Sequence, residues 1–205
     1  VRFLAHYKQT QALGLIPEIA REFAEKFGRV SGGLLRSYRT EDAELLVVAM
    51  GSVCGTIKDT IDEMRDDGIR IGLVTLVSFR PFPVEALRAS LAGAKDVVVV
   101  EKSVAVGMGG QLADNVGAAL RNLPRAPRLH SAVAGLGGRP ITRASLHHLF
   151  RQATVQPWEG THFLDLNERA VGREIHRKRK SRRSGPTAEN ILRQLAIASG
   201  LPAAE

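Results

Sequence analysis

Four short apolar runs follow one another along the middle of the chain. They are "LLVVAM", "IGLVTLV", "VVVV" and "LHSAV", at residues 45–50, 71–77, 97–100 and 129–133. Runs with so little polar alternation are typical of strands that are covered on both faces, as in a parallel sheet. We therefore predict a strand at each run.

Between and after these runs, apolar residues recur at helical spacing. Gaps of three or four residues place them on one face of a helix. The predicted faces consist of Val53, Ile57, Ile61 and Met64, then Val84, Leu87 and Leu91, then Leu112, Val116, Ala119 and Leu123, and finally Leu146, Leu149 and Phe150. Gly68 is well placed to end the first helix. This alternation predicts an α/β domain over residues 43–153, with three layers and a mostly parallel sheet that has helices on both faces.

An arm precedes this domain, over residues 1–42. One apolar stripe on a predicted helix is made of Ile16, Ala20, Phe23 and Phe27. We place Pro17 in the first turn of that helix, where proline is tolerated. The following "GRVSGGLLRSYRTEDAE", residues 28–44, is too polar for a core element and is predicted to be a connector. Because one helix alone buries little surface, we expect the arm to pack on a neighbouring domain or subunit.

An extension follows the domain, over residues 154–205. We interpret "VQPWEGTHFLDLN", residues 155–167, as a crossing segment that is anchored by Trp158 and Phe163. Nearer the end, "GPTAENILRQLAIASG" predicts a last short helix with Thr187 as its N-cap.

The net charge of +8 is concentrated in one part of this extension. Residues 169–183, "RAVGREIHRKRKSRR", hold eight Lys or Arg and one acidic residue, so this basic tail carries seven of the eight net charges. The rest of the chain is nearly neutral, which argues against a nucleic-acid-binding protein. The basic tail itself has the composition of a solvated helix or a flexible segment, and a contact with RNA or an acidic protein is the alternative.

Composition also restricts the compartment and the cofactors. No apolar stretch reaches the ~20 residues of a membrane helix. The first residues, "VRFLAHYKQTQ", lack the apolar core of a signal peptide, so we expect a cytoplasmic protein with no membrane partner. The one cysteine, Cys54, excludes an internal disulfide. It also excludes an iron–sulfur cluster held within this chain, since such a cluster takes about four cysteine ligands.

Small residues follow the first predicted strand, in "MGSVCG" at residues 50–55. A turn between a strand and a helix can hold a phosphate at the helix N-terminus, so Gly51 and Ser52 are candidates for a weak anion site. The Lys of a phosphate loop and the three glycines of a dinucleotide site are missing, however, which favours a structural turn. Cys54 has no neighbouring His in the sequence, which favours a buried structural cysteine over a nucleophile.

Two further loops carry candidate side chains for an anion site or an interface. Glu101 and Lys102 stand at the carboxyl end of the third predicted strand, where α/β proteins place ligands. The glycine-rich loops add Gly107, Gly109 and Gly110 and, further on, Arg139. Loop geometry is the alternative interpretation at these positions, with a turn into a helix capped by Thr142 after Arg139.

No arrangement typical of a catalytic or metal site is present in the sequence. The six histidines lack metal-ligand spacing, and the GxSxG motif of a Ser-His-Asp hydrolase is missing. We therefore assign no catalytic residue and no metal ligand to this chain.

Several segments resemble, in their order, one enzyme family. "YRTEDAE", "MGS", "RPFP" and "GLGGR" follow one another within residues 5–150, as in the pyruvate:ferredoxin oxidoreductase family. The resemblance is to the C-terminal part of the α subunit, a domain similar to the transketolase C-terminal domain. Residues 165–205 do not take part in it.

This resemblance implies a subunit or fragment of an enzyme that oxidatively decarboxylates pyruvate to acetyl-CoA and passes electrons to ferredoxin. The family uses thiamine diphosphate with Mg²⁺, coenzyme A and [4Fe–4S] clusters. Because this sequence lacks both a "GDG" stretch for Mg²⁺ and a cysteine cluster, the resemblance implies that these cofactors lie in partner chains or domains. The chain would then be a support domain that is inactive alone, in a complex with other subunits, and ferredoxin would be a candidate partner of the basic tail.

Two other functions stay open at this point. One is the homologous C-terminal domain of a transketolase or of a 2-oxoacid dehydrogenase E1. The other is a non-enzymatic binding module whose basic tail contacts RNA or an acidic protein. Pyruvate is preferred over other 2-oxoacids by the resemblance alone.

Overall fold

A computed structural model describes residues 1–180, and it divides the chain into two units. The first unit, Val1–Asp165, contains a helical arm and a sheet with helices. The second unit begins at Leu166, and its described part is built around one helix, α6 (Glu168–Lys180). The predicted helix capped by Thr187 and the end of the basic tail lie outside the described residues.

The sheet of the first unit has six strands in the order β1-β3-β2-β4-β5-β6. The strands are β1 (Leu35–Tyr38), β2 (Leu45–Ala49), β3 (Ile71–Leu76), β4 (Asp96–Glu101), β5 (Arg128–Val133) and β6 (Thr161–Phe163). Only β1 is antiparallel to its neighbour among these strands. The four predicted strands and the mostly parallel sheet are therefore confirmed.

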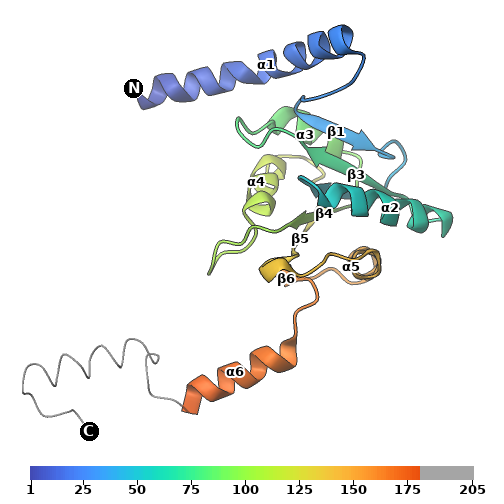
Figure 1. Cartoon of the computed structure of the whole chain (residues 1–205), viewed down its shortest axis with the longest axis vertical. Coiled ribbons are helices and arrows are strands. Elements are labelled where there is room, and N and C mark those ends of the chain that lie inside the picture. The colour runs from blue at the N-terminus through green and yellow to red at the C-terminus, as the bar shows by residue number, and fades with distance from the viewer. Residues whose placement is uncertain (181–205) are drawn as a thin grey trace, which may run out of the picture. The chain divides into compact units, whose positions relative to one another are not determined.

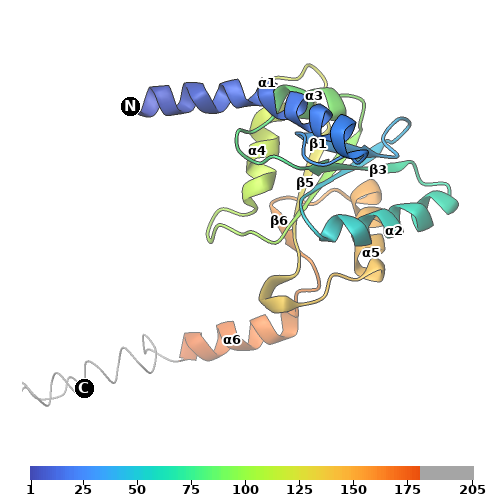
Figure 2. The same cartoon turned by 45° about the horizontal axis from the view of Figure 1, so that its top comes forward.

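Helices cover both faces of this sheet, as predicted. They are α2 (Val53–Asp66), α3 (Val84–Leu91), α4 (Gln111–Leu120) and α5 (Arg143–Val155), and a short 3₁₀ turn (Leu136–Gly138) precedes α5. The α2 and α5 helices lie on one face and α3 and α4 on the other, which gives three layers (Figures 1 and 2). Leu123, predicted to belong to α4, lies past its end and packs on the same core.

Successive side chains along each strand point to opposite faces of the sheet, which divides the core into two halves. In β2, Leu45 and Val47 face α2 and α5, whereas Leu46 and Val48 face α3 and α4. Phe150 of α5 is fully buried in the first half. Since burying a side chain of this size contributes about 1.5–3 kcal/mol, these strands and helices hold each other in place.

The sheet extends past the predicted range of residues 43–153 at both edges. Residues 35–38 form β1, although we expected this segment to be a connector without a core role. Leu35 and Tyr38 pack on the two core halves, while Arg36 and Ser37 are exposed. An edge strand gains its order from one ladder of backbone hydrogen bonds, so a polar composition did not reveal it. Likewise, part of the predicted crossing segment forms β6, which pairs with β5.

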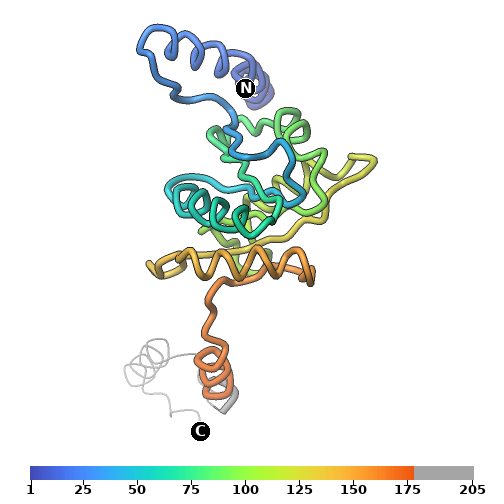
Figure 3. Tube along the Cα trace, turned by 90° about the vertical axis from the view of Figure 1, so that its right-hand side faces the viewer, coloured from blue at the N-terminus to red at the C-terminus, as the bar shows by residue number. Residues whose placement is uncertain are grey.

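The arm forms a longer helix than the sequence predicted. Helix α1 runs over Arg2–Phe27, so Pro17 lies inside it and not in its first turn. The preceding residues are rich in good helix formers such as Ala, Leu, Lys and Gln, which extends the helix toward the N-terminus. No residue of α1 is buried, and Gly28 ends the helix with its N–H donating to the Ala24 carbonyl at 2.9 Å. Figure 3 shows α1 joined to the sheet through the segment before β1.

Helix α6 is an exposed basic helix. The Asn167 side chain accepts a hydrogen bond from the Ala170 N–H at 3.0 Å, which satisfies an amide of the first turn. Arg169, Arg173 and Arg177 are exposed and follow one another at four-residue spacing. The described part of the basic tail is thus a solvated charged helix, one of the two forms that its composition predicted.

Candidate functional site

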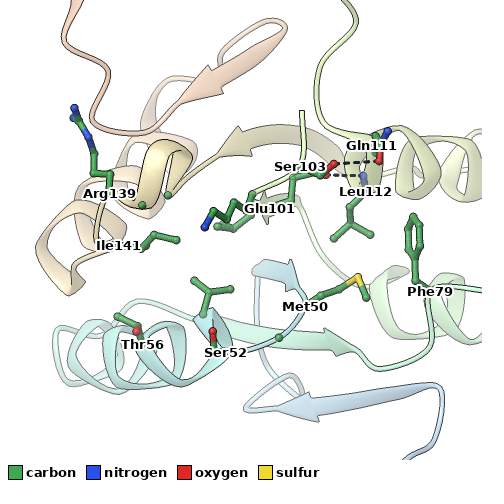
Figure 4. Close-up of a pocket in the computed structure, with 16 residues that line it drawn as sticks. Met50, Ser52, Thr56, Phe79, Glu101, Ser103, Gln111, Leu112, Arg139 and Ile141 are labelled. Carbon is green, nitrogen blue, oxygen red and sulfur yellow. Dashed lines mark hydrogen bonds between the residues drawn. The ribbon is translucent and has the colours of Figure 1, made fainter. Parts of the chain in front are cut away.

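A pocket of about 740 Å³ opens at the carboxyl ends of β2, β4 and β5. Its walls come from Met50–Val53 after β2, from residues 100–103 of β4 and the loop that follows, from the start of α4 and from the loop after β5. Ser52 and Thr56 face Ile141 across the pocket, and Leu112 and Phe79 lie toward its other end (Figure 4).

The order of the strands explains why the pocket lies there. From β2 the chain continues to β3 on one side, and it then returns to place β4 on the other side of β2. The loops that leave β2 and β4 therefore diverge to opposite faces of the sheet. In open α/β sheets a ligand crevice forms at this kind of reversal.

The structure brings together five of the eight predicted site residues. Those that line the pocket are Gly51, Ser52, Glu101, Lys102 and Arg139. Gly107, Gly109 and Gly110 do not line it. The five come from three separate loops, so the sheet topology and not their sequence spacing makes them neighbours.

The stretch after β2 is a tight turn. Gly51 has φ +75°, a conformation that favours glycine, and its carbonyl accepts a hydrogen bond from the Cys54 N–H at 3.2 Å. The Gly55 N–H donates to the Ser52 carbonyl at 3.1 Å. Two amides that a phosphate loop would direct at its ligand are thus used within the turn. Cys54 is a free cysteine and only 7 % exposed, as expected of a structural cysteine.

Glu101 caps a helix. Glu101 is 9 % exposed, and its carboxylate accepts hydrogen bonds from the N–H groups of Leu112 and Ala113, at 2.8 and 2.9 Å. The positive end of the α4 dipole stabilises the negative charge of this carboxylate. A Cβ atom at Gly110 would collide with the same carboxylate, so the glycine allows Glu101 to reach α4. Glu101 and Gly110 together therefore join β4 to α4.

The remaining glycines of this loop also have structural surroundings. Gly109 pairs with Ala105 in an isolated β-bridge, and a Cβ atom on Gly109 would collide with the Thr161 hydroxyl of β6. Gly107 has φ +84°, within the turn between the two bridge partners. Both positions shape the loop between β4 and α4.

Arg139 lies in the turn that leads from β5 into α5. Its guanidinium donates a hydrogen bond to the Asp165 carbonyl, and its side chain extends away from Ile141 (Figure 4). Thr142 caps α5 by accepting a hydrogen bond from the Ser145 N–H at 3.1 Å, as predicted. The Asp165 carboxylate in turn accepts from the Ser145 hydroxyl at 2.8 Å. Arg139 thus holds the loop at the edge of the pocket.

Lys102 is exposed, and unlike Glu101 and Arg139 it makes no ion pair or hydrogen bond with its charged group within residues 1–177. The negative charge beside it, on Glu101, is already countered by two amides of α4. The balance of charge in the pocket is therefore positive.

The residues that line the pocket lie within one known domain. Residues 43–146, about half of the chain, match the model described as pyruvate:ferredoxin oxidoreductase core domain II. The chain belongs to this family. Every residue that lines the pocket falls inside the matched range, so the pocket lies within the part of this chain that matches core domain II.

Two curated relatives of this core domain II chain are subunits of pyruvate synthases. It is 39% identical to "Pyruvate synthase subunit PorA" of Methanothermobacter thermautotrophicus over 154 residues, which is 75% of this chain and 39% of that protein. It is 42% identical to the subunit of the same name of Thermotoga maritima over 139 residues, which is 68% of this chain and 35% of that protein. The chain thus spans well under half of the length of these relatives.

Among solved structures, one that overlaps with this core domain II chain is a split-gene transketolase in an inactive β4 tetramer. The overlap covers 60% of this chain and 42% of that chain, with a TM-score of 0.47 and 18% sequence identity.

Sequence reasoning missed several polar residues of the pocket. Thr56, Ser103 and Gln111 line it from α2, from the loop after β4 and from the first position of α4. Ser103 donates a hydrogen bond to the Gln111 side chain at 3.1 Å. All three lie near the carboxyl end of a central strand. The sequence does not show this shared location, because it depends on the order of the strands in the sheet.

A polar cluster around the buried residues Asp96 and His130, at the other end of the strands, was also missed. Asp96, at the start of β4, accepts hydrogen bonds from His130 at 2.9 Å and from Arg128 at 2.8 Å. The hydrogen bond from Arg128 to Asp96 raises the pKa of the arginine. The His130 ring lies 4.7 Å from the Trp158 ring, and its Nδ1 atom has no hydrogen-bond partner among the described residues. Trp158 thus anchors its segment on β5, as predicted, with its N–H donating to the Ser131 carbonyl at 3.0 Å.

Among residues 1–180, no group of three or more His, Cys, Asp or Glu side chains could hold a metal ion. Over the same residues, no helix is both long and apolar enough to span a membrane.

Proposed function

We propose that this chain is part of the α subunit of a pyruvate:ferredoxin oxidoreductase and serves as a support domain for the assembled enzyme. The observation that carries the proposal is the core domain II match over residues 43–146, together with 39% identity to a pyruvate synthase subunit PorA. The enzyme would decarboxylate pyruvate oxidatively to acetyl-CoA. The names of the two pyruvate synthase relatives described above favour pyruvate as the 2-oxoacid.

The side chains of this domain do not suit an iron–sulfur cluster or a metal ion of such an enzyme. An iron–sulfur cluster takes about four cysteine ligands, and the one cysteine of this chain is buried between α2 and the sheet. Glu101, the one carboxylate that lines the pocket, is engaged by α4. We therefore place thiamine diphosphate, Mg²⁺, coenzyme A and the [4Fe–4S] clusters in partner chains or domains.

Activity measurements test the support role. The purified chain should show no pyruvate-dependent reduction of a viologen dye, with or without added thiamine diphosphate, because it lacks the ligands for that cofactor. Coexpression with the partner subunits should restore the activity. Turnover by the chain alone would contradict the proposal, as would a complex that forms and works without this chain.

The substrate is tested separately on the assembled complex. We expect the rate with pyruvate to exceed the rates with 2-oxoglutarate and with branched 2-oxoacids. A preference for another 2-oxoacid would contradict pyruvate as the substrate and leave the proposed support role unchanged.

A second proposal concerns the basic tail, which we infer to be a docking element for an acidic electron carrier such as ferredoxin. The observation in its favour is the row of exposed arginines on α6, at positions 169, 173 and 177. Attraction between this row and an acidic surface would steer the carrier and weaken with salt, as the Debye length falls from about 10 Å at 0.1 M to about 3 Å at 1 M.

Deleting residues 169–205 from the assembled enzyme tests this docking. We expect the deletion to raise the ferredoxin concentration needed for half-maximal rate, while the rate with a small viologen dye stays the same. If both rates are unchanged and only retention on RNA is lost, the docking proposal is wrong and an RNA contact replaces it.

A further inference from the structure

We propose that the pocket at the ends of β2, β4 and β5 binds an organic phosphate of mononucleotide size, with Lys102 holding the phosphate. Nothing in the proposed support role requires such a site. The inference starts from the one charged group of the pocket that its own domain leaves without a partner.

The charge distribution favours an anion. Lys102 makes no ion pair among residues 1–177, and Glu101 is held against two amides of α4. A lysine ammonium at a site of this kind acts as a point charge for phosphate. Arg139 donates a hydrogen bond to the Asp165 carbonyl at the edge of the pocket, whereas Lys102 is a pocket cation with no hydrogen-bond partner among residues 1–177.

Neutral donors surround the same space. The hydroxyls of Ser52 and Thr56 lie on the side of the pocket formed by α2, and Ser52 makes no capping hydrogen bond with its side chain. The N–H groups of Ser52 and Val53 likewise have no acceptor among the described residues. Phosphate oxygens accept several hydrogen bonds at once, so these donors suit a phosphate better than a carboxylate.

The size and the apolar part of the pocket restrict the rest of the ligand. A volume of about 740 Å³ is within the usual range for small-molecule sites. Beyond the polar donors, the walls are apolar and are formed by Met50, Phe79, Leu112 and Ile141. Such walls suit a flat aromatic base, and they would leave a free inorganic phosphate with few contacts.

The test uses the full chain and adenosine 5′-monophosphate as the probe. Isothermal titration should detect one site, and the backbone amide signals of Ser52, Val53 and Lys102 should shift in NMR spectra. Lys102→Ala should weaken the binding by about tenfold or more, because it removes the charge that holds the phosphate. Ser52→Ala should weaken it by a smaller factor without a change in unfolding midpoint, because that side chain does not cap α2.

Matched controls separate this site from general attraction to a basic protein. Lys95→Ala removes the same charge just before β4, at the opposite end of the strand, and should leave the affinity unchanged. Adenosine and inorganic phosphate should each bind at least about tenfold more weakly than the monophosphate. The proposal is overturned if the monophosphate does not bind at millimolar concentration, if Lys102→Ala binds as tightly as the natural chain, or if adenosine binds equally well. All measurements use the chain without partners, so their outcome does not depend on the proposed enzyme complex.

Discussion

At the scale of single residues, Glu101 shows how a candidate for binding can have a structural role. Its sequence position, at the carboxyl end of a strand, is typical of ligand-binding residues. The structure instead directs its carboxylate at the first amides of α4. A sequence gives the position of such a residue along the strand, but it does not show which donors the fold brings within hydrogen-bond distance.

The close contact at Gly110 provides a direct test of this cap. Gly110→Ala would place a Cβ atom against the Glu101 carboxylate, which must then shift or lose its bonds to α4. We expect a loss of about 1–3 kcal/mol in the free energy of unfolding, the usual cost of overpacking. Gly55→Ala is the control, because a Cβ atom there meets nothing within 4 Å and the position is inside α2. Urea denaturation should show the control as stable as the natural chain or more so.

A surface ion pair makes the stability depend on pH. Asp42 accepts hydrogen bonds from Arg65, and this contact lowers the pKa of Asp42 below its ordinary value. A carboxyl group with a lowered pKa in the folded state stabilises the protein above its unfolded pKa of about 3.9, and this stabilisation is lost as the pH falls below that value. Asp42→Asn should therefore lower the urea midpoint at pH 7 and have no effect near pH 2.

The control for the ion pair is Asp59→Asn. Asp59 is an exposed carboxyl on α2 with no ion pair among the described residues. Asp59→Asn should change the urea midpoint by the same small amount at pH 7 and near pH 2. Equal effects of the two substitutions at pH 7 would mean that the contact with Arg65 does not contribute.

At the scale of the elements, the apolar patterns predicted the buried parts of the fold better than its edges. Strands β2, β3, β4 and β5 and helices α2 to α5 were predicted because each buries an apolar run or face. The β1 and β6 strands carry few buried side chains and are ordered by backbone pairing, which leaves little trace in the hydrophobic pattern. The α1 helix was predicted too short because the apolar stripe that indicated it, from Ile16 to Phe27, lies in its second half.

Helix α1 also exposes large apolar side chains. Leu15 is 54% exposed and Ile19 is 62% exposed, one turn apart on the same helix. Such neighbouring apolar residues are a partner surface in many proteins. Replacing both by Ser should reduce the amount of partner subunit that co-purifies with the chain, while circular dichroism of the chain stays close to the original.

The matched control for α1 is replacement of Glu18 and Glu22 by Ser, which changes two exposed polar residues of the same helix. Co-purification should then be unchanged. If the Leu15 and Ile19 variant recovers as much partner as the control does, α1 is not the surface that binds it.

At the scale of the whole molecule, the strand order explains the pocket, which the sequence alone did not predict. The pocket forms because β4 returns to the far side of β2, which brings three distant loops together. Local patterns indicate where strands begin and end, but the side of the sheet on which each strand is added depends on the packing of all the helices. Five of the candidate residues were therefore known in advance, and their common pocket was not.

The bounds of the folded unit lead to a final prediction. The family match ends at residue 146, but the core of this chain includes Leu149, Phe150 and Ala153 of α5, all fully buried. Losing one large buried side chain costs about 2–5 kcal/mol, against a total stability of about 5–15 kcal/mol for a typical domain. A fragment of residues 43–146 should therefore not unfold cooperatively. A fragment of residues 28–165 keeps α5, β1 and β6 and omits only α1, which has no buried residue, and α6 with the residues after it. It should unfold in one transition in urea, followed by circular dichroism. Cooperative unfolding of the shorter fragment at the same midpoint would show that the edge strands and the end of α5 are dispensable.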